Sequence, residues 1–194
     1  MAQFKAFSPG VEVNGQTVLS VVAGMSMLES FKTMAIKVLS ANGINDPKAN
    51  QWYPQQAWLN AFKDISEKVG SATLCSIGRM IPESAQWPPS VNSVETALAS
   101  IDVAYHMNHR INGKVMFDPA TGRMVEGIGH YGFEKIGEKK VKMVCKNPYP
   151  CDFDRGIVEA VAKKFAPSGT FVTVTVTDDG RKRGGESSTY SVQW

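Results

Sequence analysis

The 194-residue chain lacks the long apolar runs of a membrane protein, because no stretch approaches the roughly 20 residues that a helix needs to cross a bilayer. It has only three cysteines, and an odd number argues against a disulfide framework. No basic and then apolar leader segment opens the sequence. We therefore expect a cytoplasmic protein that keeps its thiols reduced and has no membrane partner.

A strong charge imbalance is also missing. The 21 basic and 18 acidic residues leave a formal net charge of +3, which is too mild to indicate binding to nucleic acid. Two short basic runs, at 139–142 and 181–183, keep nucleic-acid binding open as a third hypothesis. Runs of this length are typical of solvated turns and strand ends, and we favour that interpretation.

Several catalytic signatures are absent as well. The sequence contains no Walker-type phosphate loop, no dinucleotide glycine fingerprint, no nucleophile elbow and no zincin motif. These absences leave enzymatic activity undecided and favour a binding protein over an enzyme.

The apolar pattern predicts an α+β fold. Apolar residues at helical spacing indicate helices near 26–41, 55–69, 94–109 and 151–165, with a further turn or helix over 72–80. Alternating residues and turn signals indicate strands within 112–146 and a closing hairpin over 172–194. We expect about four helices packed on one face of an antiparallel sheet. Residues 1–24 are expected to form an extended N-terminal arm, and residues 25–194 a single ligand-binding domain.

The three histidines are the first candidates for chemistry. His106 and His109 lie three residues apart on an expected helix, where they could hold a metal ion or bind a phenol or carboxylate. Asp102, four residues before His106, could instead satisfy that ring. Two histidines without a clear third ligand make a weak metal site, so we predict no metal there. His130 lies on an expected strand beside Tyr131.

Aromatic residues near these histidines suggest a pocket. Ligand pockets are mostly apolar and carry a few directed polar groups. The residues that we expect to line such a pocket are Trp87, Tyr105, His106, His109, His130 and Tyr131.

Two cysteines flank a rigid Asn-Pro-Tyr-Pro segment at 147–150. Cys151 would stand at a helix N-terminus, where an exposed thiol has a lowered pKa and can be nucleophilic or redox-sensitive. Cys145 could join it in redox chemistry, whereas Cys75 is expected to be a core thiol.

The C-terminal third resembles a known family. Residues 145–157 (CKNPYPCDFDRGI) and 180–192 (GRKRGGESSTYSV) look like the 4-vinyl reductase domain family, also called predicted hydrocarbon-binding proteins. That family is similar to the aromatic-sensing domains of transcription activators, and more distantly to TRAPP trafficking subunits and to haem–nitric-oxide sensor folds. The resemblance implies an α+β fold, often dimeric, with a ligand cavity between helices and sheet.

The zinc site of that family does not carry over. In its zinc-bearing relatives the ligands correspond to Cys151, Thr177, Gly180 and Ser188 of this chain. Only Cys151 is a usable ligand, whereas a structural zinc site needs about four donors. The resemblance therefore implies a relic zinc position, and we predict no zinc at it.

The residues and the resemblance together indicate two alternative functions. The first is a module that binds a small aromatic or hydrocarbon-like molecule as a sensor, carrier or partner protein, without a cofactor and as a homodimer. The alternative is a protein that binds or modifies haem or another tetrapyrrole. In that case one histidine among His106, His109 and His130 would ligate iron, and Cys145 or Cys151 would serve in redox chemistry.

Overall fold

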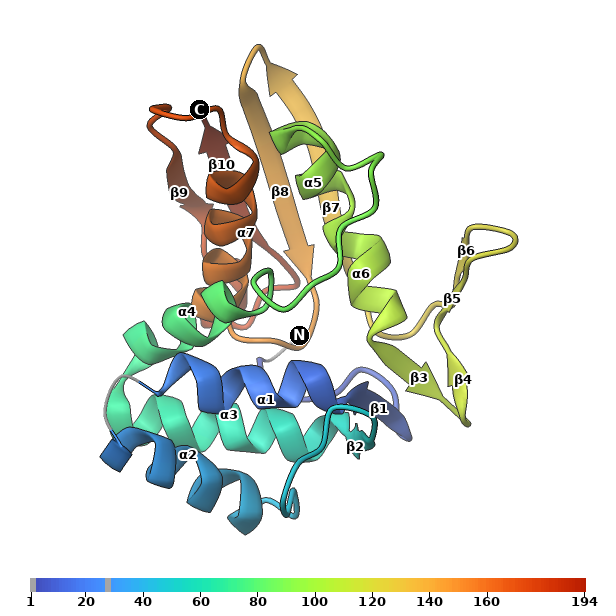
Figure 1. Cartoon of the computed structure of the whole chain (residues 1–194), viewed down its shortest axis with the longest axis vertical. Helices are drawn as coiled ribbons and strands as arrows, with labels where there is room; N and C mark the ends of the chain where they lie inside the picture. The colour runs from blue at the N-terminus through green and yellow to red at the C-terminus, as the bar shows by residue number, and fades with distance from the viewer. Residues whose placement is uncertain (1–2, 27–28) are drawn as a thin grey trace.

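A computed structural model describes residues 3–26 and 29–194 and confirms the α+β class (Figure 1). The helices in these ranges are α1 (Gly15–Gly24), α2 (Glu29–Ala41), α3 (Gln55–Val69), α4 (Ser71–Met80), α5 (Val94–Ala99), α6 (Ile101–Met107) and α7 (Cys151–Phe165). The strands are β1 (Val11–Asn14), β2 (Trp52–Pro54), β3 (His109–Ile111), β4 (Lys114–Val115), β5 (Phe117–Asp118), β6 (Arg123–Met124), β7 (His130–Gly137), β8 (Lys140–Lys146), β9 (Thr173–Asp178) and β10 (Ser188–Gln193). A 3-10 helix, η1 (Gly180–Arg183), precedes β10.

The larger sheet is antiparallel, in the order β7-β8-β10-β9. Alternate residues of β8 and β10 are buried because side chains on a strand point to opposite faces with a period of two. α7 packs on the buried face, and α5 and α6 lie beside β7 (Figure 1). The buried residues on this face of the strands are Tyr131, Val141, Met143, Cys145, Ser188, Tyr190 and Val192.

A second layer contains α1, α2 and α3, next to a small sheet in the order β2-β1-β3-β4 (Figure 1). α4 connects the two layers, because it packs against α1 and α3 on one side and α7 on the other. Its contact with α7 is unusually close: a Cβ added to Gly78 would lie 2.1 Å from the carbonyl oxygen of Phe153. Only glycine permits that approach.

Residues 15–24 form a helix, whereas the sequence analysis expected an extended arm through residue 24. Asn14 caps this helix by accepting a hydrogen bond from the backbone N–H of Thr17, 3.1 Å away. Val18 and Val21 on its inner face are fully buried. Asn14-Gly15 was taken as a turn signal, but here it marks a helix start.

The expected helix over 94–109 is two helices. It breaks at Ser100, between α5 and α6, and ends at Met107, so His109 opens β3. The expected helix from Ser26 is α2, which the structure describes from Glu29; Met27 and Leu28, expected on its apolar stripe, lie outside the described residues. Within residues 3–26 and 29–194, no helix combines the length and hydropathy required to span a bilayer.

Arg181 is buried rather than solvated, contrary to the expectation for the run at 181–183. Its Nη1 donates to the carbonyl oxygens of Asn147 (2.7 Å) and Tyr149 (2.8 Å), and its Nη2 pairs with Asp154 of α7. The other carboxylate oxygen of Asp154 accepts from the hydroxyl of Tyr131, 2.5 Å away. This network, which we call the Arg181 cluster, joins η1, the 147–149 loop, α7 and β7.

Removing either Arg181 or Asp154, which form a buried ion pair, should strongly destabilise the fold. Arg181→Met leaves the buried carboxylate of Asp154 without its counter-charge, and breaking a buried pair costs about 3–5 kcal/mol. The matched control is Arg183→Met, two residues on, because Arg183 is exposed and exposed ion pairs contribute less than about 1 kcal/mol. Urea unfolding measures both changes, and equal losses in the two variants would contradict the role given to Arg181.

Candidate functional site

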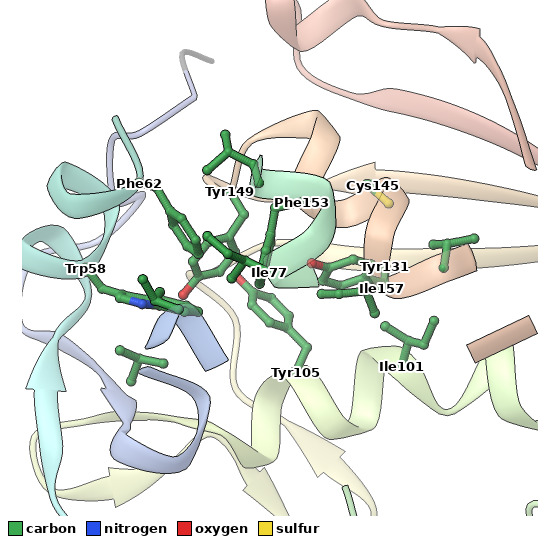
Figure 2. Close-up of a cluster of buried hydrophobic side chains, with 14 of the residues drawn as sticks. Trp58, Phe62, Ile77, Ile101, Tyr105, Tyr131, Cys145, Tyr149, Phe153 and Ile157 are labelled. Atoms are coloured by element: carbon green, nitrogen blue, oxygen red, sulfur yellow. The ribbon is translucent and has the colours of Figure 1, made fainter. Parts of the chain in front are cut away.

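A cavity of about 120 Å³ lies between the two layers. Residues from α1, α3, α6, β7, α7 and the loop after α4 line it. Many of these side chains belong to the cluster of buried residues in Figure 2, where Trp58, Tyr105 and Tyr149 lie close together. The aromatic side chains of the lining are Trp58, Trp87, Tyr105, Tyr131, Tyr149 and Phe153.

His109 is one of the polar residues of the cavity wall, together with Gln16, Thr17, Ser84 and Asn108. Its Nδ1 lies 2.7 Å from the carbonyl oxygen of Tyr105, and its Nε2 lies 2.6 Å from the hydroxyl of Tyr149. A carbonyl oxygen only accepts, so the proton of the neutral ring sits on Nδ1 and Nε2 accepts from Tyr149. The same hydroxyl accepts from Nε2 of Gln55, 3.1 Å away.

Burial lowers the pKa of His109 to about 4. The charged imidazolium would lose its hydration in this interior, and no carboxylate is among the causes that shift it. At neutral pH the cavity wall therefore presents an uncharged imidazole. Burial also raises the pKa of Tyr149 and of Tyr105, so both phenols stay protonated.

Two buried polar atoms beside this wall have no hydrogen-bond partner among the described residues. They are Nε1 of Trp58, a donor, and Oε1 of Gln55, an acceptor. Buried polar groups in folded proteins are nearly always paired, with protein or with an enclosed molecule. Trp58 itself lines the cavity, so this unpaired donor belongs to a residue of the wall.

The cavity includes four of the six residues expected to line a pocket. Trp87, Tyr105, His109 and Tyr131 are part of its lining. His106 and His130 are not: they lie together outside it, with ring centroids 5.0 Å apart, beside Asp102.

Two residues of the lining, Trp58 and Tyr149, are not among the six expected from the sequence. Trp58 matches the apolar stripe of a helix, and such a stripe does not distinguish core from cavity lining. The Asn-Pro-Tyr-Pro segment at 147–150 has no periodicity that would indicate which way Tyr149 faces. The side chain of Tyr149 lines the cavity, while Nη1 of Arg181 donates to the backbone carbonyl of the same residue and holds it in place.

The cysteines lie outside the cavity lining, and all three are buried. Cys151 is only 3% exposed, and burial raises the pKa of its thiol, so the condition for a lowered pKa is not met. Its Sγ lies 2.9 Å from Oγ of Ser188. Burial likewise raises the pKa of Cys145, which argues against a thiolate at either position.

Comparisons with solved structures show an H-NOX fold. An H-NOX protein from S. oneidensis in the Fe(II)NO ligation state matches with a TM-score of 0.63 at 9% identity, over 93% of this chain and 98% of that chain. An oxygen-binding H-NOX domain related to soluble guanylate cyclases, in its oxygen complex, has a TM-score of 0.61 at 17% identity, over 93% and 94% of the two chains. An H-NOX domain used to probe haem distortion in that family has a TM-score of 0.62 at 17% identity, with the same coverage.

No protein-family model matches the chain, and no curated protein sequence matches it. The resemblance to the 4-vinyl reductase or hydrocarbon-binding family is therefore wrong as an assignment: the structural neighbours are H-NOX domains. The motifs behind it cover short segments of the last fifty residues, whereas the structural match covers 93% of the chain. At these identities the likeness shows the fold alone.

Some of those neighbours are described with haem, so we asked whether the cavity fits that group. The donor chemistry is suitable once the Tyr149 hydroxyl is displaced, because the neutral His109 carries its lone pair on Nε2 and its Nδ1–H is held by a carbonyl. The size of the cavity is not suitable for haem, because its volume of about 120 Å³ is less than the roughly 150 Å³ of a cavity that admits one benzene ring. No Lys or Arg is among the described lining residues to pair with propionates. The residues present do not fit a haem.

The neutral state of His109 predicts acid sensitivity. Its pKa is 6.5 in the unfolded chain and about 4 in the fold, so only the unfolded state gains a proton between these values. Stability is therefore complete above pH 6.5 and falls by up to about 3 kcal/mol as the pH drops to 4.

The test compares the wild type with His109→Gln, which cannot titrate. The variant should be less stable at pH 7, and this deficit should shrink toward pH 4.5 in urea unfolding. A deficit that stays constant with pH would mean that His109 is not held neutral.

Proposed function

We propose that this chain is a small-molecule-binding sensor module with an H-NOX fold, and that its ligand is a compact, mainly apolar molecule carrying one hydrogen-bond acceptor. The observation that carries the proposal is the unpartnered Nε1 donor of Trp58, a residue of the aromatic cavity wall. An apolar pocket with few directed polar groups is the usual form of a small-molecule site.

The cavity volume limits the ligand to about one ring. A cavity of roughly 150 Å³ admits benzene, and this one is about 120 Å³. Because the cavity is only partly enclosed, the ligand class is a single six-membered ring with one small substituent, or a short branched chain. The acceptor of the ligand would bind the indole N–H of Trp58. The hydroxyl of Tyr149 and Nε2 of His109 are already hydrogen-bonded to each other.

A ligand at this position would contact both layers of the fold. Gln16 and Thr17 of α1 line one side, and Ile157 and Val161 of α7 line another. The ligand-binding unit thus includes part of the segment 1–24 as well as residues 25–194. Occupancy can bias how the layers pack, which is the requirement for a sensor. We propose that the output passes to a partner protein or to a second copy of the chain.

A haem-binding sensor is the second candidate. The structural neighbours described with haem, together with the lone pair of His109 in the cavity wall, favour it. It requires the aromatic lining to move apart, because the described cavity is too small for a porphyrin.

Trp58→Phe should abolish a preference for ligands with an acceptor. Phenol and toluene have nearly the same size, and a net hydrogen bond of about 1 kcal/mol predicts roughly fivefold tighter binding of phenol by the wild type. Ligand-observed NMR titration should show that this ratio falls to about one in the variant.

Trp87→Phe is the matched control. Trp87 also lines the cavity, but its indole N–H already donates to the carbonyl of Pro82, 3.3 Å away. Its replacement should leave the phenol-to-toluene ratio unchanged. If the wild type binds neither molecule, or if both variants lose the ratio equally, the role of Trp58 is refuted.

Reconstitution with haemin separates the two candidates. We expect no stoichiometric Soret band from the purified chain, because the cavity excludes a porphyrin. A stoichiometric band that His109→Ala removes would establish the second candidate instead.

A further inference from the structure

Asp102, His106 and His130 form a cluster outside the cavity lining, and we propose that it binds one divalent transition-metal ion of the zinc class. Each residue offers one ligand atom, and these atoms lie within 4.8 Å of one another. The inference does not depend on the proposed function, because none of the three residues lines the cavity.

The spacing of the donors is close to that of a metal shell. Nδ1 of His130 lies 2.9 Å from a carboxylate oxygen of Asp102, and a ring nitrogen of His106 completes the group within the 4.8 Å limit. With bonds of about 2.0–2.1 Å in tetrahedral geometry, neighbouring donors stand roughly 3.3 Å apart. The three ligand atoms would therefore draw closer together around an ion.

His106 is a buried imidazole with an unused nitrogen. Its side chain has no exposed surface, and its Nδ1 lies 2.8 Å from the backbone carbonyl oxygen of Asp102. Its Nε2 has no hydrogen-bond partner among the described residues. A ring that donates one N–H to a carbonyl and keeps a free lone pair has the tautomer of a metal-ligating histidine.

The other two residues also have outer partners of the kind that metal ligands have. Asp102 accepts from the backbone N–H of Tyr131, 2.9 Å away, which holds its carboxylate in place. Nε2 of His130 lies 3.1 Å from the carboxylate of Glu126, so Nε2–H can donate outward when an ion takes the place of the Nδ1 proton that now faces Asp102. This carboxylate–histidine pairing is the usual second shell of zinc sites.

The donor set indicates which ion would bind. Two imidazoles and one carboxylate suit zinc or ferrous iron rather than calcium or magnesium, which prefer oxygen donors. His130 is 38% exposed, so the fourth position is open to water. The ion would tie α6 to the first residue of β7. The sequence predicts no metal because the pair His106 and His109 has no clear third ligand, whereas the fold brings His106 together with Asp102 and His130.

Metal titration of the full chain tests this inference. Protein stripped with EDTA should bind one equivalent of Co²⁺ with visible d–d bands, and one equivalent of Zn²⁺ should displace it. Asp102→Asn and His130→Ala should weaken zinc binding by more than the roughly 10–100-fold that loss of an outer partner costs. His130→Ala is the key variant, because this partly exposed side chain can be removed with the least harm to folding, which circular dichroism checks.

Cys151→Ser is the control, since it removes another metal-binding residue type outside the cluster, and it should bind zinc like the wild type. The same three residues without a metal would form only an ion pair between His130 and its carboxylates. A folded wild type that takes up no stoichiometric Co²⁺ or Zn²⁺ would establish that ion pair and overturn the inference. Wild-type affinity in Asp102→Asn and His130→Ala would overturn it equally.

Discussion

The buried guanidinium of Arg181 is the interaction on which the geometry of the cavity depends. It is almost fully buried, and it binds the carbonyls of Asn147 and Tyr149 together with the carboxylate of Asp154. A buried charge is tolerated only where such partners surround it. The network therefore holds the segment before α7 in one position, from which the ring of Tyr149 reaches Nε2 of His109.

Aromatic packing explains how an H-NOX fold can contain so small a cavity. The ring centroid of Trp58 lies 5.1 Å from that of Tyr149 and 5.8 Å from that of Phe153, both in edge-to-face contact. These rings lie within one cluster of buried side chains (Figure 2). The fold thus limits where a ligand can bind, and the side chains limit its size and its polar contacts.

The short segment from α6 into β3 contributes to two separate sites. Tyr105 and His109 line the cavity, whereas Asp102 and His106 form the proposed metal cluster with His130. Asp102 and His106 are four residues apart on α6, which is the spacing that keeps two side chains on one face of a helix. His109 lies beyond that helix, and its Nδ1 is held 2.7 Å from the carbonyl oxygen of Tyr105. β7 also contributes to both sites: His130 belongs to the proposed metal cluster and Tyr131 to the cavity lining. These adjacent residues point to opposite faces of the strand.

The sequence by itself determined the α+β class, the bounds of α3, the start of α7 and the strand β8, because apolar spacing along one segment decides which face is buried. It also identified Tyr105, His109 and Tyr131 as candidates for the pocket. Only the tertiary structure decided the helix at 15–24, the burial of Arg181, the contact of Trp58 with Tyr149 and the meeting of His106 with His130. These features join residues far apart in the chain or depend on what covers a segment, and local spacing has no information about either.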